Sequence, residues 1–391
     1  MVSVEKALEL IATNCVGLRT EKRLLANALN TILAKAILSP IDMPPFRQSA
    51  MDGYAIHFTK EAKTYTLIGE IAAGSAKKIT LNAGEAVRIF TGAAVPDTAT
   101  HVVQQELITR TEKTISFTTE LTTAQNIRPV GEQIKEGETA LHEKSLLNAA
   151  AIGFLASIGI TTVEVYAQPK IGLLLTGDEL IKPGTSLTYG QIYESNSIML
   201  EAALKQHQLP GPTLLKVADD LHATQTALAE LLSENDVVLI SGGISVGDYD
   251  FVKTALENLG VTEQFYKVKQ KPGKPLFFGT KGMKLVFALP GNPASALTCF
   301  YIYALPALQA LSGKEFTGLK KVQRKISGIY QKKAGLAHFL KVSCNEESVT
   351  ILESQSSAML NTYALANGLL FVPEATEKIM QDERVDVYLL D

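Results

Sequence analysis

The spacing of hydrophobic and polar residues divides this chain into regions of different character. Apolar residues recur at helical spacing over 4–11, after Ser3 as a good N-cap, and again over 24–32. Three prolines between positions 40 and 45 then favour an extended connector. From about 48 to 140, β-prone segments alternate with Gly, Asn and Pro turns, at 64–71, 86–90, 101–107 and 114–119. The pattern predicts two N-terminal helices and then an all-β module, a small barrel or sandwich.

The second half of the chain has a different pattern. Continuous apolar runs at 170–175, 236–241 and 284–289 are typical of strands buried in a parallel sheet. Helical patterns lie between these runs, at 197–207, 221–233 and 251–259, and a last helix begins at Pro293. This alternation predicts a doubly wound α/β domain. After about 315 the pattern returns to β, with a final strand expected at 385–389.

These changes predict four domains. An elongated, helical linker domain is expected at 1–47 and 141–167, because the helical pattern at 146–157 should rejoin the N-terminal helices. An inserted β domain takes 48–140 and the α/β domain takes 168–314. A C-terminal β domain, expected to be barrel-like, takes 315–391.

Composition excludes several classes of protein. The chain has 391 residues, of which 46% are hydrophobic and 20% charged, as is typical of a soluble globular protein. A net charge of −3 gives no global field for nucleic acid or an acidic membrane, so any anion site must be local. The cysteines are far apart and fit neither a zinc spacing nor a disulfide framework. The N-terminus is not a signal peptide, and the longest weakly polar run, 146–160, is too short to span a bilayer. We therefore expect a cytoplasmic protein.

Each of the predicted α/β strands ends in a polar turn. The turns read TGDEL at 176–180, GGISVGD at 242–248 and PGNPAS at 290–295. Ligands of open α/β sheets bind outside the carboxyl ends of the strands, so we expect the turns to converge on one crevice. Taken alone, PGNPAS also fits a simple helix start, and Asp220 fits an N-cap of the helix at 221–233.

The stretch 241–275 adds carboxylates and amines to this edge of the sheet. Glycines let a backbone approach a phosphate, carboxylate oxygens suit Mg²⁺, and lysines supply compact positive charge. The stretch contains Asp248, Asp250, Lys267, Lys271 and Lys274. The combination predicts an oxyanion or phosphate bound with a divalent cation, although a tight turn with exposed lysines would explain each feature alone. The sequence contains no HExxH or Walker A pattern, and no stretch is interpreted as a GxSxG nucleophile elbow, so nucleophilic catalysis is unsupported.

Several motifs along the chain resemble one known family. They are SAMDGYA (49–55), RIFTGA (88–93), NIR-x-x-GE (126–132), TGDEL (176–180), SGGISVGDYDF (241–251), KPGKP (271–275) and ALPGNPASAL (288–297). Their identity and order resemble the molybdopterin molybdotransferase family, which includes the C-terminal domain of gephyrin, over residues 1 to about 372. The resemblance implies a homodimer that converts adenylylated molybdopterin and molybdate into molybdenum cofactor and AMP, with Mg²⁺. It also implies a cleft formed by residues of both subunits.

The resemblance assigns roles to particular residues. Catalytic roles fall on Asp52, Thr91, Asp220, Asp250, Lys267 and Lys271, and Mg²⁺ would be held by Glu179, Asp220 and Asp250. Molybdate would bind a lysine and serine cluster that contains Lys271, Lys274, Ser356 and Ser357. The remaining substrate contacts would be Gly242, Gly243, Ser245, Gly247, Asp248, Pro290, Gly291 and Asn292.

The chain departs from the family pattern at a few positions. Gln133 stands where Asp is usual, Pro129, Leu336 and Lys341 stand where Arg is common, and Ala358 stands where Gly is common. A paralogue tuned to tungstate therefore remains an alternative, as does a non-catalytic gephyrin-like scaffold, which would not require the acidic residues. A different phosphoanhydride enzyme is a further alternative, against which the SAMDGYA module argues. The family also implies a molybdopterin adenylyltransferase and molybdoenzymes as protein partners.

Overall fold

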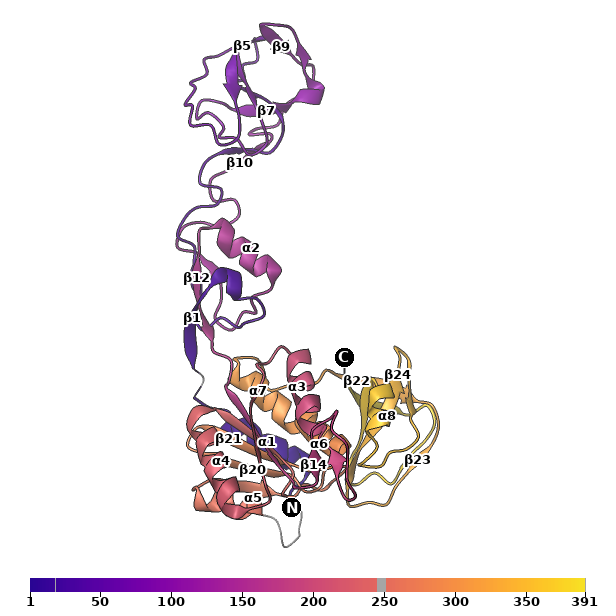
Figure 1. The fold of residues 1–391 in the computed structure, drawn as a ribbon. Helices are drawn as coiled ribbons and strands as arrows, with labels where there is room; N and C mark the ends of the chain where they lie inside the picture. Colours follow the sequence, from indigo (N-terminus) through magenta and orange to yellow (C-terminus); the bar gives the residue numbers. More distant parts are fainter. Residues whose placement is uncertain (18, 245–250, 391) are drawn as a thin grey trace. The chain divides into compact units, whose positions relative to one another are not determined.

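The computed structural model describes residues 1–17, 19–244 and 251–390, and it contains two compact units (Figure 1). The first unit takes Met1–Glu21, Asn30–Ala34 and Glu164–Asp391, and the second takes Lys22–Leu29 and Lys35–Val163. Two of the unit boundaries fall inside strands β1 (Thr20–Leu24) and β12 (Thr162–Tyr166). Each unit has a hydrophobic core of its own.

A six-stranded sheet forms the centre of the first unit. Its strands, in spatial order, are β16 (Thr213–Val217), β13 (Ile171–Thr176), β17 (Val237–Ser241), β21 (Lys284–Leu289), β20 (Phe277–Lys281) and β18 (Thr262–Tyr266). The first four are parallel, and the last two pair antiparallel. The three strands predicted from continuous apolar runs are thus neighbours in the middle of the sheet, and that prediction is confirmed.

Helices cover both faces of this sheet (Figure 1). Alternate strand residues such as Leu174 and Ile240 pack with α4 (Leu221–Glu234) and α5 (Phe251–Asn258). The side chains between them pack with helices on the other face, which are α1 (Val4–Asn14), α3 (Asn196–Gln206), α6 (Pro293–Cys299), the π-helical turn Phe300–Ala304 and α7 (Leu305–Leu311). This arrangement is the doubly wound domain that the sequence predicts. The predicted N-cap is also confirmed, since the Ser3 side chain accepts a hydrogen bond from Lys6 N.

The segment Pro293–Leu311 is apolar and long enough, by length and composition, to cross a membrane. In this fold 89% of its most apolar window is buried inside the protein. Its apolar composition is therefore explained by its place in the core beneath the sheet.

The C-terminal part of the first unit is a closed five-stranded barrel. Its strands are β22 (Lys321–Ile326), β24 (Ala337–Cys344), β25 (Ser348–Ile351), β26 (Gly368–Val372) and β28 (Arg384–Leu389). The barrel closes because β24 pairs with both β25 and β26. Smaller elements are β23 (Tyr330–Gln331), β27 (Lys378–Ile379) and α8 (Leu360–Leu365). The barrel-like C-terminal domain is thus confirmed, and β19 (Gln270–Lys271) joins its edge by pairing with β24.

Residues 48–140 of the second unit form β structure, as the sequence predicts. A six-stranded sheet has the order β7 (His101–Gln104), β4 (Gly53–Ile56), β6 (Glu85–Ile89), β5 (Tyr65–Ile71), β9 (Thr114–Ser116) and β8 (Thr109–Arg110). Two-stranded pairs join β2 (Ile37–Leu38) to β11 (Thr139–Leu141) and β3 (Gln48–Ser49) to β10 (Ile127–Arg128). Helix α2 (Ala149–Ser157) confirms the helical pattern at 146–157.

The helix expected over 24–32 is wrong. Strand β1 ends at Leu24, a short 3₁₀ turn follows at Leu25–Asn27, and Asn30 adopts a left-handed φ of 62°. The apolar spacing was misleading because Leu24 and Leu29 are 59% and 53% exposed, so these residues do not form one buried stripe.

We predict that Phe287→Ala destabilises the first unit by about 3–5 kcal/mol, because the ring is fully buried and packs against Phe278 with ring centroids 4.9 Å apart. Denaturant unfolding monitored by fluorescence or circular dichroism measures the change. The control Leu214→Ala alters a half-exposed residue on the outer strand β16 of the same sheet and should cost roughly 1 kcal/mol or less. Equal losses in the two variants would contradict the assignment of the core.

Candidate functional site

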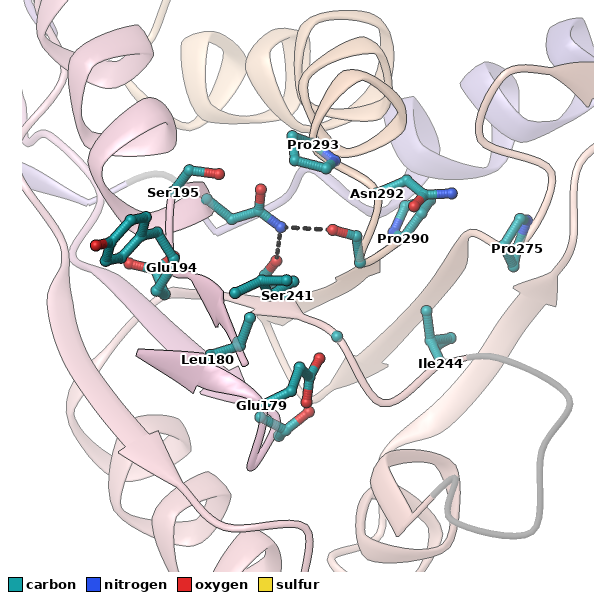
Figure 2. Close-up of a pocket in the computed structure, with 16 residues that line it drawn as sticks. Glu179, Leu180, Glu194, Ser195, Ser241, Ile244, Pro275, Pro290, Asn292 and Pro293 are labelled. Carbon is teal, nitrogen blue, oxygen red and sulfur yellow. Dashed lines mark hydrogen bonds between the residues drawn. The ribbon is translucent and has the colours of Figure 1, made fainter. Parts of the chain in front are cut away.

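A cavity of about 380 Å³ lies at the carboxyl ends of the parallel strands (Figure 2). Its lining includes Thr176 at the end of β13 and Glu179 after it, Ser241 at the end of β17 and Gly242 after it, and the turn 290–293 after β21. The predicted convergence of the three polar turns on one crevice is therefore confirmed.

The register of the sheet brings these turns together. Leu175 pairs with Ser241, and Ser241 pairs with Leu289, so the three strands end at the same level of the sheet. The Gly-rich turn then crosses close to β13, with φ of +96° at Gly242 and +61° at Gly243. A Cβ at Gly242 would lie 2.7 Å from the Thr176 carbonyl oxygen, so a side chain does not fit there. Glycine is required at this turn both for conformation and for space.

The segment that leads into α3 adds a wall that the sequence pattern does not predict. Strand β15 (Ile192–Tyr193) pairs with β14 (Leu180–Ile181), and both line the cavity. Asn196 then donates from Nδ2 to Ser241 Oγ at 2.8 Å and to the Gly291 carbonyl oxygen at 2.9 Å, the two dashed contacts in Figure 2. Asn196 thus ties the ends of β17 and β21 together. The polar run YESNS at 193–197, which leads into the first turn of α3, was the available signal.

Two buried polar atoms at this wall have no hydrogen-bond partner among the described residues. They are Thr176 Oγ1 and Asn196 Oδ1. The Asn196 amide cannot be turned over, because its nitrogen faces the Gly291 carbonyl, which only accepts. Unpaired buried polar atoms are rare in packed cores, so this wall has the character of a polar site.

Acidic side chains gather next to the cavity. Burial raises the pKa of Asp219, and the nearby charges of Asp178 and Glu179 raise it further. Asp220 accepts a hydrogen bond from Ala223 N at 2.8 Å, so its carboxylate caps α4 as the simpler interpretation predicts. Within 1–17, 19–244 and 251–390 no three acidic, His or Cys residues are grouped as a metal site. The uncompensated negative charge nevertheless suits a hard cation with oxygen ligands, such as Mg²⁺.

The lysine turn is fixed from inside the protein. Gln270 is fully buried, donates from Nε2 to the Pro272 carbonyl oxygen at 2.9 Å, and accepts from the Tyr303 hydroxyl. Lys271 and Lys274 are exposed, and neither forms an ion pair within the described part of the chain. The turn therefore presents two unpaired cations on a rigid backbone.

Lys267 lies nearby in the chain but is placed differently. It has a left-handed φ of 70°, and its Nζ lies 4.7 Å from the centroid of the Tyr266 ring. The ring face stabilises the ammonium and holds it beside its own strand. No described contact joins Lys267 to Lys271 or Lys274.

Asn292 and Ser357 come together although they are far apart in sequence. Asn292 occupies the N-cap position of α6, but its side chain makes no cap hydrogen bond. Its Nδ2 donates instead to Ser357 Oγ at 3.2 Å, so the helix start that PGNPAS fits is present but has no side-chain cap. Ser356 and Ser357 lie in the loop before α8, and Lys271 lies on β19, which pairs with β24.

The second unit brings Asp52 and Thr91 together. Thr91 donates to Asp52 Oδ1 from its backbone nitrogen at 2.8 Å and from its hydroxyl at 2.9 Å. The backbone hydrogen bond, and then the hydroxyl, lower the pKa of Asp52. A Cβ at Gly53 would lie 2.0 Å from the Val103 carbonyl oxygen, which explains the glycine of SAMDGYA. Both residues are exposed to solvent, and the hydrogen bonds from Thr91 stabilise the Asp52 side chain as a carboxylate.

Four of the expected site residues lie outside the described residues. They are Ser245, Gly247, Asp248 and Asp250. Their expected roles remain predictions.

Comparison with known proteins agrees with this architecture. Three family descriptions match in order: "MoeA N-terminal region (domain I and II)" over 2–159, "Probable molybdopterin binding domain" over 172–310 and "MoeA C-terminal region (domain IV)" over 327–390. A Haemophilus influenzae protein named molybdopterin molybdenumtransferase is 38% identical over 300 residues, which cover 76% of this chain and 74% of that protein. Molybdopterin molybdenumtransferase 2 of Mycobacterium tuberculosis is 30% identical over 99% of each chain.

A solved structure shares the whole fold. The molybdopterin biosynthesis MoeA protein from Pyrococcus horikosii superposes with a TM-score of 0.86, at 28% identity, over 100% of this chain and 99% of that one. The matched regions, the relatives over the full length and the shared fold lead to one conclusion: this chain belongs to the MoeA family, whose curated members are named molybdopterin molybdenumtransferases.

Proposed function

We propose that this protein inserts molybdate into adenylylated molybdopterin and releases AMP, in a Mg²⁺-dependent step of molybdenum cofactor biosynthesis in the cytoplasm. The observation that carries the proposal is the cavity at the strand ends, with a glycine turn, acidic residues and an unpaired lysine turn on one domain. The names of the relatives support the same reaction class.

The substrate's pterin and phosphate groups are assigned to the cavity. Backbone N–H groups of glycine turns bind phosphate oxygens, and Gly242, Gly243 and Gly291 place such turns at its edge. Pro290 and Asn292 complete this edge, and Ser245, Gly247 and Asp248 are assigned to it from sequence.

Molybdate is assigned to the lysine turn and the serine loop. Lys271 and Lys274 supply charge that no ion pair neutralises among the described residues, and Ser356 and Ser357 supply hydroxyl donors. Two lysines match the double negative charge of the oxyanion, and Lys267 would extend the positive field toward the phosphates.

The acidic residues fit the proposed cation in charge and chemistry. Glu179 lines the cavity, Asp220 keeps its second oxygen after capping α4, and Asp250 is assigned from sequence. Bound Mg²⁺ would neutralise phosphate charge as AMP leaves. The chain's own residues orient the substrate: the glycine turns by backbone contact and the lysines by charge.

We propose a homodimer in which Asp52 and Thr91 of one copy complete the cleft of the other. Thr91 holds the exposed Asp52 carboxylate in a fixed orientation by two hydrogen bonds. Among the described residues of its own domain, this carboxylate has no other evident role. An adenylyltransferase would supply the substrate, and molybdoenzymes would accept the product.

The first test is Lys271→Ala. We expect molybdate binding by calorimetry to weaken at least tenfold, because one of two unpaired charges is removed, and AMP release to fall with it. The control Lys281→Ala removes an exposed lysine at the end of β20 and should leave both measurements unchanged. Unaltered molybdate affinity in Lys271→Ala would overturn the assignment of this turn.

The second test mixes two inactive variants, Asp52→Ala and Lys271→Ala. If the cleft takes these residues from different copies, about a quarter of the clefts regain both after subunit exchange, since half the dimers are mixed and each has one intact cleft. Mixtures should therefore recover activity that neither variant has. An active protein that sediments as a monomer would contradict the shared cleft. So would a mixture in which subunit exchange is demonstrated but no activity is recovered.

The third test concerns the pKa of His338, a side chain beside the positive charge of Lys271. The β19–β24 register places His338 opposite Lys271, and the Tyr330 hydroxyl lies 2.7 Å from His338 Nδ1. Burial, and then the charges of Lys332 and Lys271, lower the pKa of His338 to about 4. Unfolding allows this imidazole to take up a proton below its ordinary pKa of 6.5, whereas the folded protein does so only near 4.

The contribution of His338 to stability should therefore be complete above pH 6.5 and should be lost as the pH falls toward 4. Denaturant unfolding across this range should show a smaller acid loss in His338→Gln than in wild type. His222→Gln, at an exposed position of α4, should keep the wild-type slope. Identical pH profiles for His338→Gln and wild type would contradict the lowered pKa of His338 in the folded protein.

A further inference from the structure

A buried ammonium lies under the loop that carries Ser356 and Ser357. Lys341 is only 3% exposed. Its Nζ donates to the carbonyl oxygens of Ser354 at 3.0 Å, Ser356 at 3.3 Å and Met359 at 3.0 Å. All three donors of the ammonium are thus directed into one short loop.

The position of Lys341 on its strand makes this burial unusual. Ala337 and Phe339, its neighbours on the same face of β24, belong to the core shared with the α/β domain, whereas Leu340 and Val342 point into the barrel. An apolar residue would suit this face. No ion pair of Lys341 occurs within the described residues, and burial lowers its pKa. Among the described residues, its charge is therefore balanced by carbonyl dipoles and by no carboxylate.

Other contacts organise the same loop around Lys341. The Gln355 side chain accepts from Lys341 N at 2.9 Å and donates to the Lys341 carbonyl oxygen at 2.8 Å. Ser354 adopts a left-handed φ of 60°, and its carbonyl also accepts from the Thr362 hydroxyl. The loop then meets Asn292 through Ser357. Because β24 also pairs with β19, one strand holds both the serine loop and the lysine turn.

We propose that Lys341 is a positioning residue for oxyanion binding: it fixes the loop 354–359 so that Ser356 and Ser357 face the ligand, and its uncompensated charge strengthens anion binding there. The proposal rests on the proposed function, since it assumes that molybdate binds at these serines. Lys341 itself does not touch the ligand, because its three donors are occupied by the loop.

The test is calorimetric titration of the full-length protein with molybdate alone. Lys341→Met keeps the side-chain length but removes the donors and the charge, and it should weaken binding about tenfold, as loss of a group that orients ligands does. Lys341→Arg keeps the positive charge and the hydrogen-bond donors, so its molybdate affinity should lie within about threefold of wild type. Lys284→Met is the matched control, because Lys284 also donates to two main-chain carbonyls, but at the opposite end of the sheet. It should bind molybdate like wild type.

A double-variant cycle separates positioning from general stability. If Lys341 acts through the loop, Ser357→Ala should weaken molybdate binding in wild type and have little further effect in Lys341→Met. Fully additive effects would overturn the proposal. If Lys341→Met does not fold, Lys341→Gln takes its place, since an amide keeps two donors without the charge.

The outcomes for the two proposals can be told apart. Wild-type affinity in a folded Lys341→Met overturns this inference alone. No molybdate binding by the wild-type protein overturns the proposed function and this inference together.

Discussion

The register of three buried parallel strands is the constraint on which the rest of the structure depends. β13, β17 and β21 pair so that Leu175, Ser241 and Leu289 stand side by side, and each strand then releases a polar turn at that level. The register is strongly fixed because both faces are buried: Leu173 and Leu175 enter one core, and Leu174 enters the other. A slip of one residue would exchange these faces and separate the turns.

Side-chain amides then hold the loops that the sheet releases. Asn196 joins the ends of β17 and β21, and Gln270 holds the lysine turn from below. In each case the amide nitrogen bonds to a carbonyl oxygen, which only accepts, so the orientation of the side chain is determined. These amide contacts add to the short ladders β14–β15 and β19–β24 and hold the polar loops in place, as a site that binds charged groups requires.

The sequence predicted those parts whose signal is local. Continuous apolar runs identified the three central strands, and Ser3 identified the start of α1. The same reasoning was wrong at 24–32, because apolar spacing does not reveal whether Leu24 and Leu29 are buried. The strand-end turns were found because topology fixes where they lie. Asn196, Gln270 and Lys341 were not recognised as supports, because their partners are set by the folded chain, as with Asn196 and Gly291, 95 positions apart.

The most direct test of the central claim is a diffraction experiment on crystals soaked with AMP and molybdate, using anomalous scattering at the molybdenum edge. We predict AMP in the cavity beside Gly242 and Gly291, and a molybdenum peak beside Lys271, Lys274 and Ser357. A molybdenum peak away from the lysine turn, in crystals that show AMP in the cavity, would contradict it.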